Sequence, residues 1–424
     1  MRLLHTSDWH LGQSLHNYDR AYEHQRFLDW LLDALVAEQA DALLIAGDIF
    51  DNANPSSASQ KQLYRFLQQA RARVPHLNLI VIAGNHDSPG RLEAPAPLLE
   101  MHGTRVVGAV PRRADGEIDV EQLVLPLTGR GGEVEAWCLA VPFLRPGDVP
   151  RVAIDADATA ADAAPGAAAG LPADPYLAGI ALLYRQALAL ALSRRRPGQA
   201  IVAMGHCHMV DGQMSNDSER RIVIGGTEML PAGIFDAAIA YAALGHLHLA
   251  QAVGQRQHIR YCGSPIPLSF AEVGYRHQIL RVDLDSDAVR EIAPLAIPRA
   301  VELLRVPARP APLAQVLAEL AALDYPDAAP EAQPLLEVRV RLDAPEPGLR
   351  ARIEAALDGK PLRLAKIETS SAPRSAAVDP TLTLDQLDQL KPDDIFQRLY
   401  LQKFGNAAPS EQLGAFAELM LHRV

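Results

Sequence analysis

The first half of the chain alternates short apolar runs with longer stretches in which apolar residues recur every three or four positions. Short runs rich in aliphatic residues predict strands, and the longer periodic stretches predict amphipathic helices. The expected strands are Arg2–Thr6, Ala42–Ala46, Leu77–Ala83, Trp137–Val141, Ile201–Met204, Arg221–Ile224, Tyr241–Leu244 and His258–Tyr261. The expected helices are Tyr22–Glu38 and Ser57–Ala72. This alternation predicts a layered α/β domain.

After about residue 276 the pattern changes to that of a compact α+β unit. The strands expected there are Val301–Val306, Leu335–Leu342 and Leu362–Glu368, and the helices are Leu313–Leu323 and Gly348–Leu357. Residues 1–275 are therefore assigned to a first domain, 276–369 to a second, 370–381 to a linker and 382–424 to a helical tail. An Ala-rich segment at 152–170 offers little apolar surface and is expected to be a surface insertion.

The helical tail carries apolar residues but has no large core of its own. Short helices of this kind dock on a partner, or they pack as a hairpin on their own chain. The pattern alone leaves both arrangements open.

Composition narrows the class of protein. The chain has 424 residues, with 40 Lys and Arg against 51 Asp and Glu, which gives a formal net charge of −11. This acidic balance excludes a protein that coats polyanions, although contact through one groove or through bound cations is still allowed. Three widely separated cysteines, Cys138, Cys207 and Cys262, cannot form a disulfide framework and favour a reducing cytoplasm. The apolar stretch Leu177–Leu192 contains Arg185, so it is expected to be a helix of a soluble protein.

Five polar clusters each follow a predicted strand. They are SDWH at Ser7–His10, GDIFD at Gly47–Asp51, GNHD at Gly84–Asp87, GHCH at Gly205–His208 and GHLH at Gly245–His248. A single GD or GH after a strand is usually a turn, but five such clusters in one domain favour a shared site, because the carboxyl ends of parallel strands meet at one sheet edge.

The residue types in these clusters point to metal chemistry. Carboxylate, amide and imidazole groups without thiolate favour Mn²⁺, Fe or Zn²⁺. The candidate ligands are Asp8, His10, Asp48, Asn85, His206, His246 and His248, and the carboxylate of Asp48 can bridge two ions. Two ions about 4 Å apart polarise a phosphoryl group and generate hydroxide near neutral pH. Asp51 and Asp87 are expected to hold loops or to orient neighbouring residues.

The order D-x-H, GDxxD, GNHD, GH and GHxH resembles that of the calcineurin-like metallophosphoesterase superfamily. Five longer segments, among them LHTSDWHLGQ at Leu4–Gln13, AGNHDS at Ala83–Ser88 and YCGSPIPLSFAE at Tyr261–Glu272, resemble more narrowly the SbcD-type nuclease subunits of bacterial SbcCD complexes. The resemblance implies an α/β fold with a four-layer β-sandwich flanked by helices, a small α+β capping domain and a C-terminal helical segment that binds the coiled coil of an SbcC-type ATPase.

The resemblance also implies roles for individual residues. One metal would be held by Asp8, His10, Asp48 and His248, and the other by Asp48, Asn85, His206 and His246. His86 would stabilise or protonate the leaving oxygen, and Asp87 would orient His86. Both metals would be Mn²⁺, with Mg²⁺ as a substitute. His208 has no counterpart among the family's ligands.

The implied activity is two-metal hydrolysis of DNA phosphodiesters in DNA repair, recombination and replication. It comprises an ATP-dependent 3′–5′ exonuclease on duplex ends and an endonuclease on single strands and hairpins. The chain has no nucleotide-binding loop, because its one GK pair, Gly359–Lys360, is followed by Pro361, so ATP must bind to the partner. The resemblance implies a homodimer within a heterotetramer. The alternatives are another phosphoesterase of this fold, acting on nucleotides or phosphoproteins, and a non-catalytic DNA-end scaffold.

Overall fold

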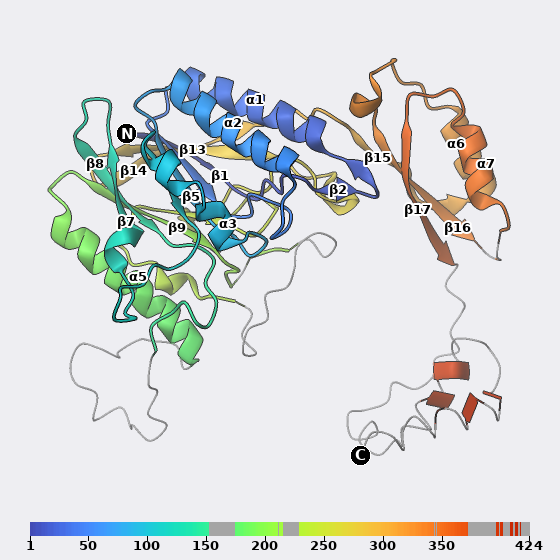
Figure 1. The fold of residues 1–424 in the computed structure, drawn as a ribbon. Helices are drawn as coiled ribbons and strands as arrows, with labels where there is room; N and C mark the ends of the chain where they lie inside the picture. Colours follow the sequence, from blue (N-terminus) through green and yellow to red (C-terminus); the bar gives the residue numbers. More distant parts are fainter. Residues whose placement is uncertain are drawn as a thin grey trace. The chain divides into compact units, whose positions relative to one another are not determined.

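The computed structural model describes residues 1–151, 174–210, 212–214, 229–342, 344 and 346–371, together with 396–397, 399–401, 408–409, 412–413 and 416. The chain divides into a first unit, Met1–Ser370, and a second unit, Ser371–Val424. The first unit contains two six-stranded sheets and a three-stranded sheet (Figure 1). The expected strand Arg221–Ile224 and the insertion at 152–170 lie outside the described residues.

The first sheet has the strand order β14-β13-β1-β4-β5-β6. Its strands are β1 (Arg2–Thr6), β4 (Ala42–Ala46), β5 (Asn78–Ile82), β6 (Thr104–Val107), β13 (Gln278–Asp285) and β14 (Ala288–Ala296). The pairs β1–β4, β4–β5 and β5–β6 are parallel, whereas β13 is antiparallel to β1 and β14 to β13. All five residues of β4, ALLIA, are buried, as expected for a parallel strand covered on both faces.

The second sheet has the order β11-β12-β10-β9-β8-β7. Its strands are β7 (Val124–Thr128), β8 (Val134–Ala140), β9 (Ala200–His206), β10 (Tyr241–Gly245), β11 (Gln251–Val253) and β12 (Arg256–Tyr261). The inner strands β8, β9, β10 and β12 are parallel to one another. In each sheet the carboxyl ends of the parallel strands therefore lie side by side at one edge.

Helices cover the outer faces of both sheets, which gives the expected four layers (Figure 1). Helices α1 (Ala21–Ala37) and α2 (Ser57–Arg73) pack on the first sheet, with Phe27 and Leu31 of α1 in one core with Leu43 of β4. Neighbouring positions in β4 point the other way, into the core between the two sheets. Helix α2 begins at Ser56, whose hydroxyl accepts a hydrogen bond from Ser59 N–H at 3.1 Å.

Helix α5 (Pro175–Arg194) packs on the second sheet. It is the one helix among the described residues that is long and apolar enough to cross a membrane. Leu183, Ala187 and Ala191 are fully buried and belong to the same core as the second sheet. Its apolar composition is therefore that of a core helix.

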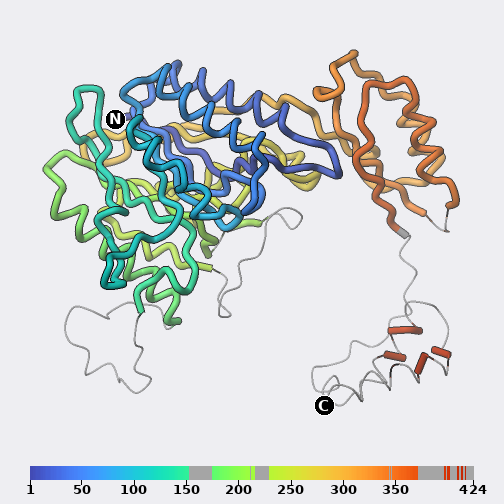
Figure 2. Tube along the Cα trace, in the orientation of Figure 1, coloured from blue at the N-terminus to red at the C-terminus, as the bar shows by residue number. Residues whose placement is uncertain are grey.

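The second domain is a three-stranded sheet covered by two helices. Its elements are β15 (Leu303–Pro312), α6 (Leu313–Ala321), β16 (Leu335–Leu342), α7 (Leu349–Ala356) and β17 (Arg363–Ser371). Leu336, Val338 and Val340 of β16 alternate into a core with the helices. Leu335, on the opposite face, packs with Leu15 of the hairpin formed by β2 (Ser14–Leu15) and β3 (Tyr18–Asp19). The tube in Figure 2 follows the chain through both domains.

The predicted start of the second domain at residue 276 was too early. Strands β13 and β14 belong to the first sheet, where β13 pairs with β1 in the register Arg2↔Asp283. The first domain therefore extends through Ala296. The local sequence pattern could not reveal that the chain returns to the first sheet after residue 276, because β13 joins that sheet by pairing with β1, near the start of the chain.

The tail falls largely outside the described residues, as does most of the expected linker at 370–381. The described residues 396–397, 399–401, 412–413 and 416 are helical. The rings of Phe396 and Phe416 stack at 4.4 Å, and Leu399 and Leu401 are exposed.

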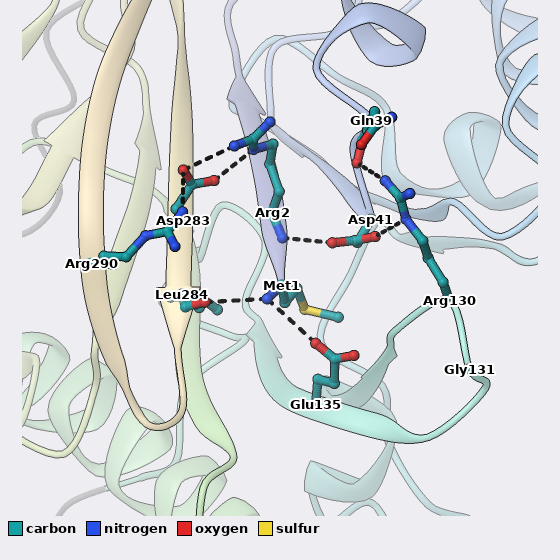
Figure 3. Close-up of a pocket in the computed structure, with 10 residues that line it drawn as sticks. All are labelled: Met1, Arg2, Gln39, Asp41, Arg130, Gly131, Glu135, Asp283, Leu284 and Arg290. Atoms are coloured by element: carbon teal, nitrogen blue, oxygen red, sulfur yellow. Dashed lines mark hydrogen bonds and ion pairs between the residues drawn. The ribbon is translucent and has the colours of Figure 1, made fainter.

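A network of ion pairs and hydrogen bonds surrounds the amino-terminal end of β1 (Figure 3). Arg2 Nε lies 2.7 Å from Asp283 Oδ1, and Arg290 reaches the other oxygen of Asp283 at 3.2 Å. Asp41 accepts the backbone N–H of Arg2 at 2.7 Å and faces Arg130 Nε at 3.2 Å. Burial would raise the pKa of Asp283, but Arg2 and Arg290 hold it below its usual value. Each of these two carboxylates is therefore paired with arginine.

Candidate metal centre

The predicted ligands lie at the carboxyl ends of strands from both sheets. Asp8 and His10 follow β1, Asp48 follows β4 and Asn85 follows β5, while His206 ends β9. His246 and His248 follow β10. Backbone bonds continue the β1–β4 pairing into the loops, since Asp8 N–H donates to Gly47 O and His10 N–H to Asp48 O, each at 3.0 Å. The topology thus brings together residues that are up to 240 positions apart in the sequence.

The backbone at the centre is strained. Asp8, His10, Asp48 and His246 have φ values of 55°, 47°, 50° and 107°. Non-glycine residues rarely occupy this region, and such strain clusters at functional sites. The packing is tight as well, because a Cβ on Gly84 would lie 2.8 Å from Asp48 Cγ.

One group of ligands consists of Asp8, His10 and His248. Their ligand atoms lie within 4.8 Å of one another, and all three residues are buried. Asp8 Oδ2 accepts the Ser7 hydroxyl at 2.5 Å, and Asp8 Oδ1 accepts the backbone N–H of His246 at 3.0 Å. These contacts hold the carboxylate of Asp8 in a fixed orientation beside the two imidazoles.

A second group is formed by Asn85, His206 and His246. Asn85 Oδ1 lies 2.9 Å from His206 Nε2 and 3.3 Å from His246 Nδ1. His206 Nδ1 lies 2.9 Å from the carbonyl of Ala46, which can only accept, so Nδ1 carries the proton and Nε2 faces the site. The structure therefore gathers three of the four residues assigned to the second metal around one point, the Asn85 amide oxygen.

Asp48 joins the two groups. One of its oxygens lies 3.5 Å from His10 Nε2 and 3.4 Å from His206 Nε2, and the other accepts His86 N–H at 2.8 Å. Burial would raise the pKa of Asp48, but His206, His10 and His86 lower it well below its usual range. Burial likewise opposes protonation of His206, yet Asp48 raises the pKa of His206 to about 9. A metal ion that binds here must displace that proton.

The donor set fits divalent cations. Among the described residues neither Asp8 nor Asp48 forms an ion pair with Arg or Lys. His10 Nε2 and His246 Nε2 are buried and make no hydrogen bond within the described part of the chain. Buried carboxylates and open imidazole nitrogens without basic partners are compensated by bound cations. Carboxylate, amide and imidazole ligands match Mn²⁺, Fe and Zn²⁺.

His86 lies beside the ligands, and its ring is 4.8 Å from that of His10. His86 Nδ1 lies 2.6 Å from the backbone carbonyl of Asp51. Asp87 does not supply the expected partner: its carboxylate accepts the backbone N–H groups of Ile49, Phe50 and Gly84 at 3.1, 2.9 and 2.8 Å. Asp87 therefore ties the two loops together, and the Asp51 carbonyl orients His86.

A further geometric group contains His10, Asp48 and His86, whose ligand atoms also lie within 4.8 Å of one another. His208, which has no role predicted from the sequence, is buried with its ring 6.0 Å from that of His246. Burial raises the pKa of Cys207 to about 12, and its thiol lies 3.7 Å from Met209 Sδ.

Two residues of the centre were not predicted from the sequence. Ser7 donates to Asp8, and Glu272 Oε1 lies 2.9 Å from His248 Nδ1. Ser7 stands inside the SDWH cluster, and Glu272 ends the segment YCGSPIPLSFAE, so both were visible in the sequence as parts of quoted motifs.

The fold and the site define a metal-dependent phosphoesterase, and comparison with known proteins agrees. A family model described as calcineurin-like phosphoesterase matches residues 1–250, and one described as type 5 capsule protein repressor C-terminal domain matches residues 299–404. Similar proteins include the SbcD subunit of the nuclease SbcCD from Rhodobacter capsulatus, 39% identical over 93% of both chains, and that from Escherichia coli, 32% identical over 94% of this chain and 92% of that one. The Bacillus subtilis protein of the same name is 34% identical over 67% of this chain and 66% of its own. The chain belongs to the SbcD family of calcineurin-like phosphoesterases.

Proposed function

We propose that this chain is the nuclease subunit of an SbcCD-type complex and hydrolyses DNA phosphodiesters with two Mn²⁺ ions. The observation that carries the proposal is that six candidate ligands converge with the seventh, Asp48, at the ends of five strands, and that His86 lies beside them. Asp8, His10, Asp48 and His248 would hold one ion, and Asp48, Asn85, His206 and His246 the other. Mg²⁺ is the expected substitute.

The metals would polarise the phosphate and lower the pKa of a bound water, which supplies the nucleophile. The contribution of the protein is to fix the ligands before the substrate arrives. The strained loops hold Asp8 and Asp48, while backbone N–H groups occupy the carboxylate oxygens that would otherwise rotate. A preorganised site of this kind loses little energy to rearrangement during the reaction.

His86 is proposed to act on the leaving oxygen. Its Nδ1 donates to the Asp51 carbonyl, and in a protonated ring Nε2–H is the second donor, which would serve the phosphate or the departing alkoxide. General acid catalysis of this kind requires a proton within hydrogen-bond reach of the leaving atom.

The proposed activities are an ATP-dependent 3′–5′ exonuclease on duplex ends and an endonuclease on single strands and hairpins, in the cytoplasm. ATP would bind to an SbcC-type ATPase, since this chain has no nucleotide-binding loop. The roles in repair, recombination and replication rest on this assignment.

A substrate comparison tests the proposal. Purified chain, alone and with the ATPase subunit and ATP, is given Mn²⁺ and end-labelled hairpin DNA, duplex DNA or p-nitrophenyl phosphate. Cleavage of the hairpin, and duplex degradation that requires ATP, are expected. Turnover of the small ester alone would refute the assignment to DNA and favour a general phosphoesterase. No turnover of any substrate would favour a non-catalytic scaffold.

The tail is proposed to bind the coiled coil of the ATPase subunit. Leu399 and Leu401 are more than half exposed, which leaves apolar surface for a partner. Deletion of residues 382–424 should abolish co-purification with the ATPase and leave Mn²⁺ uptake unchanged. Co-purification that survives the deletion would favour a tail packed on its own chain.

Two copies of the chain are proposed within the heterotetramer. Leu98 and Met101 are 69% and 81% exposed and offer apolar surface for contact between copies. Light scattering of the isolated chain should give the mass of a dimer, and replacing both residues by Glu should give a monomer that still binds Mn²⁺.

A further inference from the structure

The segment Tyr261–Glu272 has no ligand or catalytic residue in the proposed function, yet it runs beside the metal centre. Ser264 N–H donates to the carbonyl of His248 at 3.1 Å. Gly263 has a φ of 82°, and a Cβ there would lie 2.7 Å from that same carbonyl. The close approach allowed by Gly263 places the segment directly against the loop that carries His248.

Glu272 makes the contact with the clearest chemical consequence. It is fully buried, and its two oxygens lie 2.9 Å from His248 Nδ1 and 2.7 Å from Leu268 N. A carboxylate accepts, so His248 Nδ1 must carry a proton in order to bond with it. The remaining nitrogen, Nε2, is then left as the ligand atom toward Asp8 and His10. The Leu268 N–H therefore orients the carboxylate of Glu272, and this carboxylate in turn orients the imidazole of His248.

A second contact from the same segment reaches another ligand of the same metal. Cys262 Sγ lies 3.1 Å from the hydroxyl of Ser7, and Ser7 donates to Asp8 at 2.5 Å. The hydroxyl of Ser7 has one proton, and it is used on Asp8, so the thiol proton of Cys262 is shared between Ser7 Oγ and the Gly263 carbonyl, which lies 3.4 Å from Sγ. Burial raises the pKa of Cys262 and keeps it a thiol.

We infer that Glu272 and the Cys262–Ser7 pair are positioning residues for one of the two metals, the one held by Asp8, His10 and His248. The inference rests on the proposed function for the existence of that metal. Glu272 sets the protonated nitrogen and the ring plane of His248, and Ser7 sets the oxygen that Asp8 presents. In the described residues the second group is oriented differently, since His206 bonds to the Ala46 carbonyl. Loss of Glu272 should therefore weaken one site selectively.

The test is a Mn²⁺ titration by calorimetry, with electron paramagnetic resonance of the bound ions. The wild-type chain should bind two ions. Glu272→Gln keeps the size of the side chain but offers one acceptor oxygen to two donors. It should weaken one of the two binding steps by about 10- to 100-fold, the usual effect of losing a hydrogen-bond partner behind a metal-bound histidine. At low Mn²⁺ its spectrum should be that of a single ion. Ser7→Ala should affect the same step.

A double variant separates positioning from general stability. If Glu272 acts through His248, then adding Glu272→Gln to His248→Ala should weaken metal binding no further than His248→Ala alone. Glu302→Gln is the matched control, because Glu302 lies on the surface, 3.6 Å from Arg299, and should change neither step. Thermal unfolding of the metal-free variants monitors the fold.

The metal titrations separate the positioning role of Glu272 from the existence of the two metal sites. Two wild-type sites of which one is weakened in Glu272→Gln, with no further loss in the double variant, support the positioning role. Two sites with unchanged affinities in Glu272→Gln, equal weakening of both steps, or an additive double variant would overturn it and leave the proposed function intact. A wild-type chain that takes up no Mn²⁺ would overturn both.

Discussion

The two ends of strand β1 differ in the partners of their buried carboxylates. At the amino-terminal end, Arg2 pairs with Asp283 at 2.7 Å, and Asp41 faces Arg130 (Figure 3). At the carboxyl end, Asp8 and Asp48 are buried without an Arg or Lys partner in the described part of the chain. One end is neutralised by arginines, whereas the other faces titratable histidines, among them His206, whose proton a bound metal ion would displace.

Backbone strain adds to this difference. Asp8, His10 and Asp48 themselves have positive φ values, whereas at the other end the charged residues Arg2, Asp41 and Asp283 do not, and the positive φ belongs to the uncharged Gln39. Backbone strain and buried carboxylates without an Arg or Lys partner both cost stability, and of the two ends of β1 they coincide at the one where the ligands converge. The contrast teaches that buried carboxylates alone do not mark a site, because those with an arginine partner are structural.

The largest expected effect follows from removing the carboxylate that joins the two ligand groups. Asp48→Asn should lower DNA cleavage by about 10³-fold or more, because a metal contributes several kcal/mol to the transition state and each tenfold loss corresponds to about 1.4 kcal/mol. Mn²⁺ uptake by calorimetry should fall with it. Asp283→Asn is the matched change at the other end of β1 and should leave uptake unchanged. A fully active Asp48→Asn enzyme would show that this carboxylate is as structural as Asp283.

A variant of His86 distinguishes the catalytic step from metal binding at the carboxyl end of β1. His86→Ala should reduce cleavage of hairpin DNA by about 10²- to 10⁴-fold, the usual contribution of a general acid. Both Mn²⁺ ions should remain bound, since His86 is assigned to the leaving oxygen. Loss of one ion in this variant would instead make His86 a ligand, as its distance from His10 and Asp48 permits.

The carboxyl end of β1, but not the arginine network at its other end, could be predicted from local sequence. Strands β1 and β4 have the predicted bounds, because short apolar runs bordered by polar clusters are local signals. The ligands could be chosen because each follows such a strand and the carboxyl ends of parallel strands share an edge.

Other features depend on contacts that no local pattern carries. Strand β13 pairs with β1 across about 280 residues, so its membership of the first sheet was missed. The family resemblance assigned Asp87 to His86, its neighbour in sequence, but the carboxylate bonds to the backbone of Ile49 and Phe50. This agrees with the other expectation for Asp87, that it holds loops together. Glu272 lies 24 residues from His248, and only the fold brings them together.

His5 lies within β1, between its two ends. It is a buried imidazole that stays neutral in the folded chain, and its effect on the free energy of unfolding can be measured. It bonds to Tyr241 Oη at 2.8 Å, and burial lowers the pKa of His5 to about 3. The unfolded chain takes up a proton near pH 6.5 and the folded chain does not, so stability should fall as the pH drops from 6.5 toward 3. At about 1.4 kcal/mol per pKa unit, the loss amounts to a few kcal/mol.

Urea unfolding of the metal-free chain at several pH values measures this dependence. His5→Gln cannot titrate, so its stability should decline less steeply below pH 6.5. His102→Gln is the control, because His102 is exposed and its loss should leave the slope unchanged. An equal slope in wild type and His5→Gln would assign the acid sensitivity to other buried histidines.

The smallest effect is expected at the amino-terminal end. Asp283→Asn removes the charge that pairs with Arg2 and Arg290, and it should lower the free energy of unfolding by about 1–3 kcal/mol, the cost of losing hydrogen bonds to a buried charged group. Arginine lowers the pKa of Asp283 below 3.8, so the carboxylate is charged at neutral pH and stabilises the fold there. This stabilisation is lost as the pH falls through the lowered pKa. The difference in free energy of unfolding between wild type and variant, measured with urea, should therefore shrink below about pH 4. The Mn²⁺ affinity at neutral pH should stay the same. A variant that lost metal affinity together with stability would mean that the two ends of β1 are coupled, and the division between a structural and a functional end would fail.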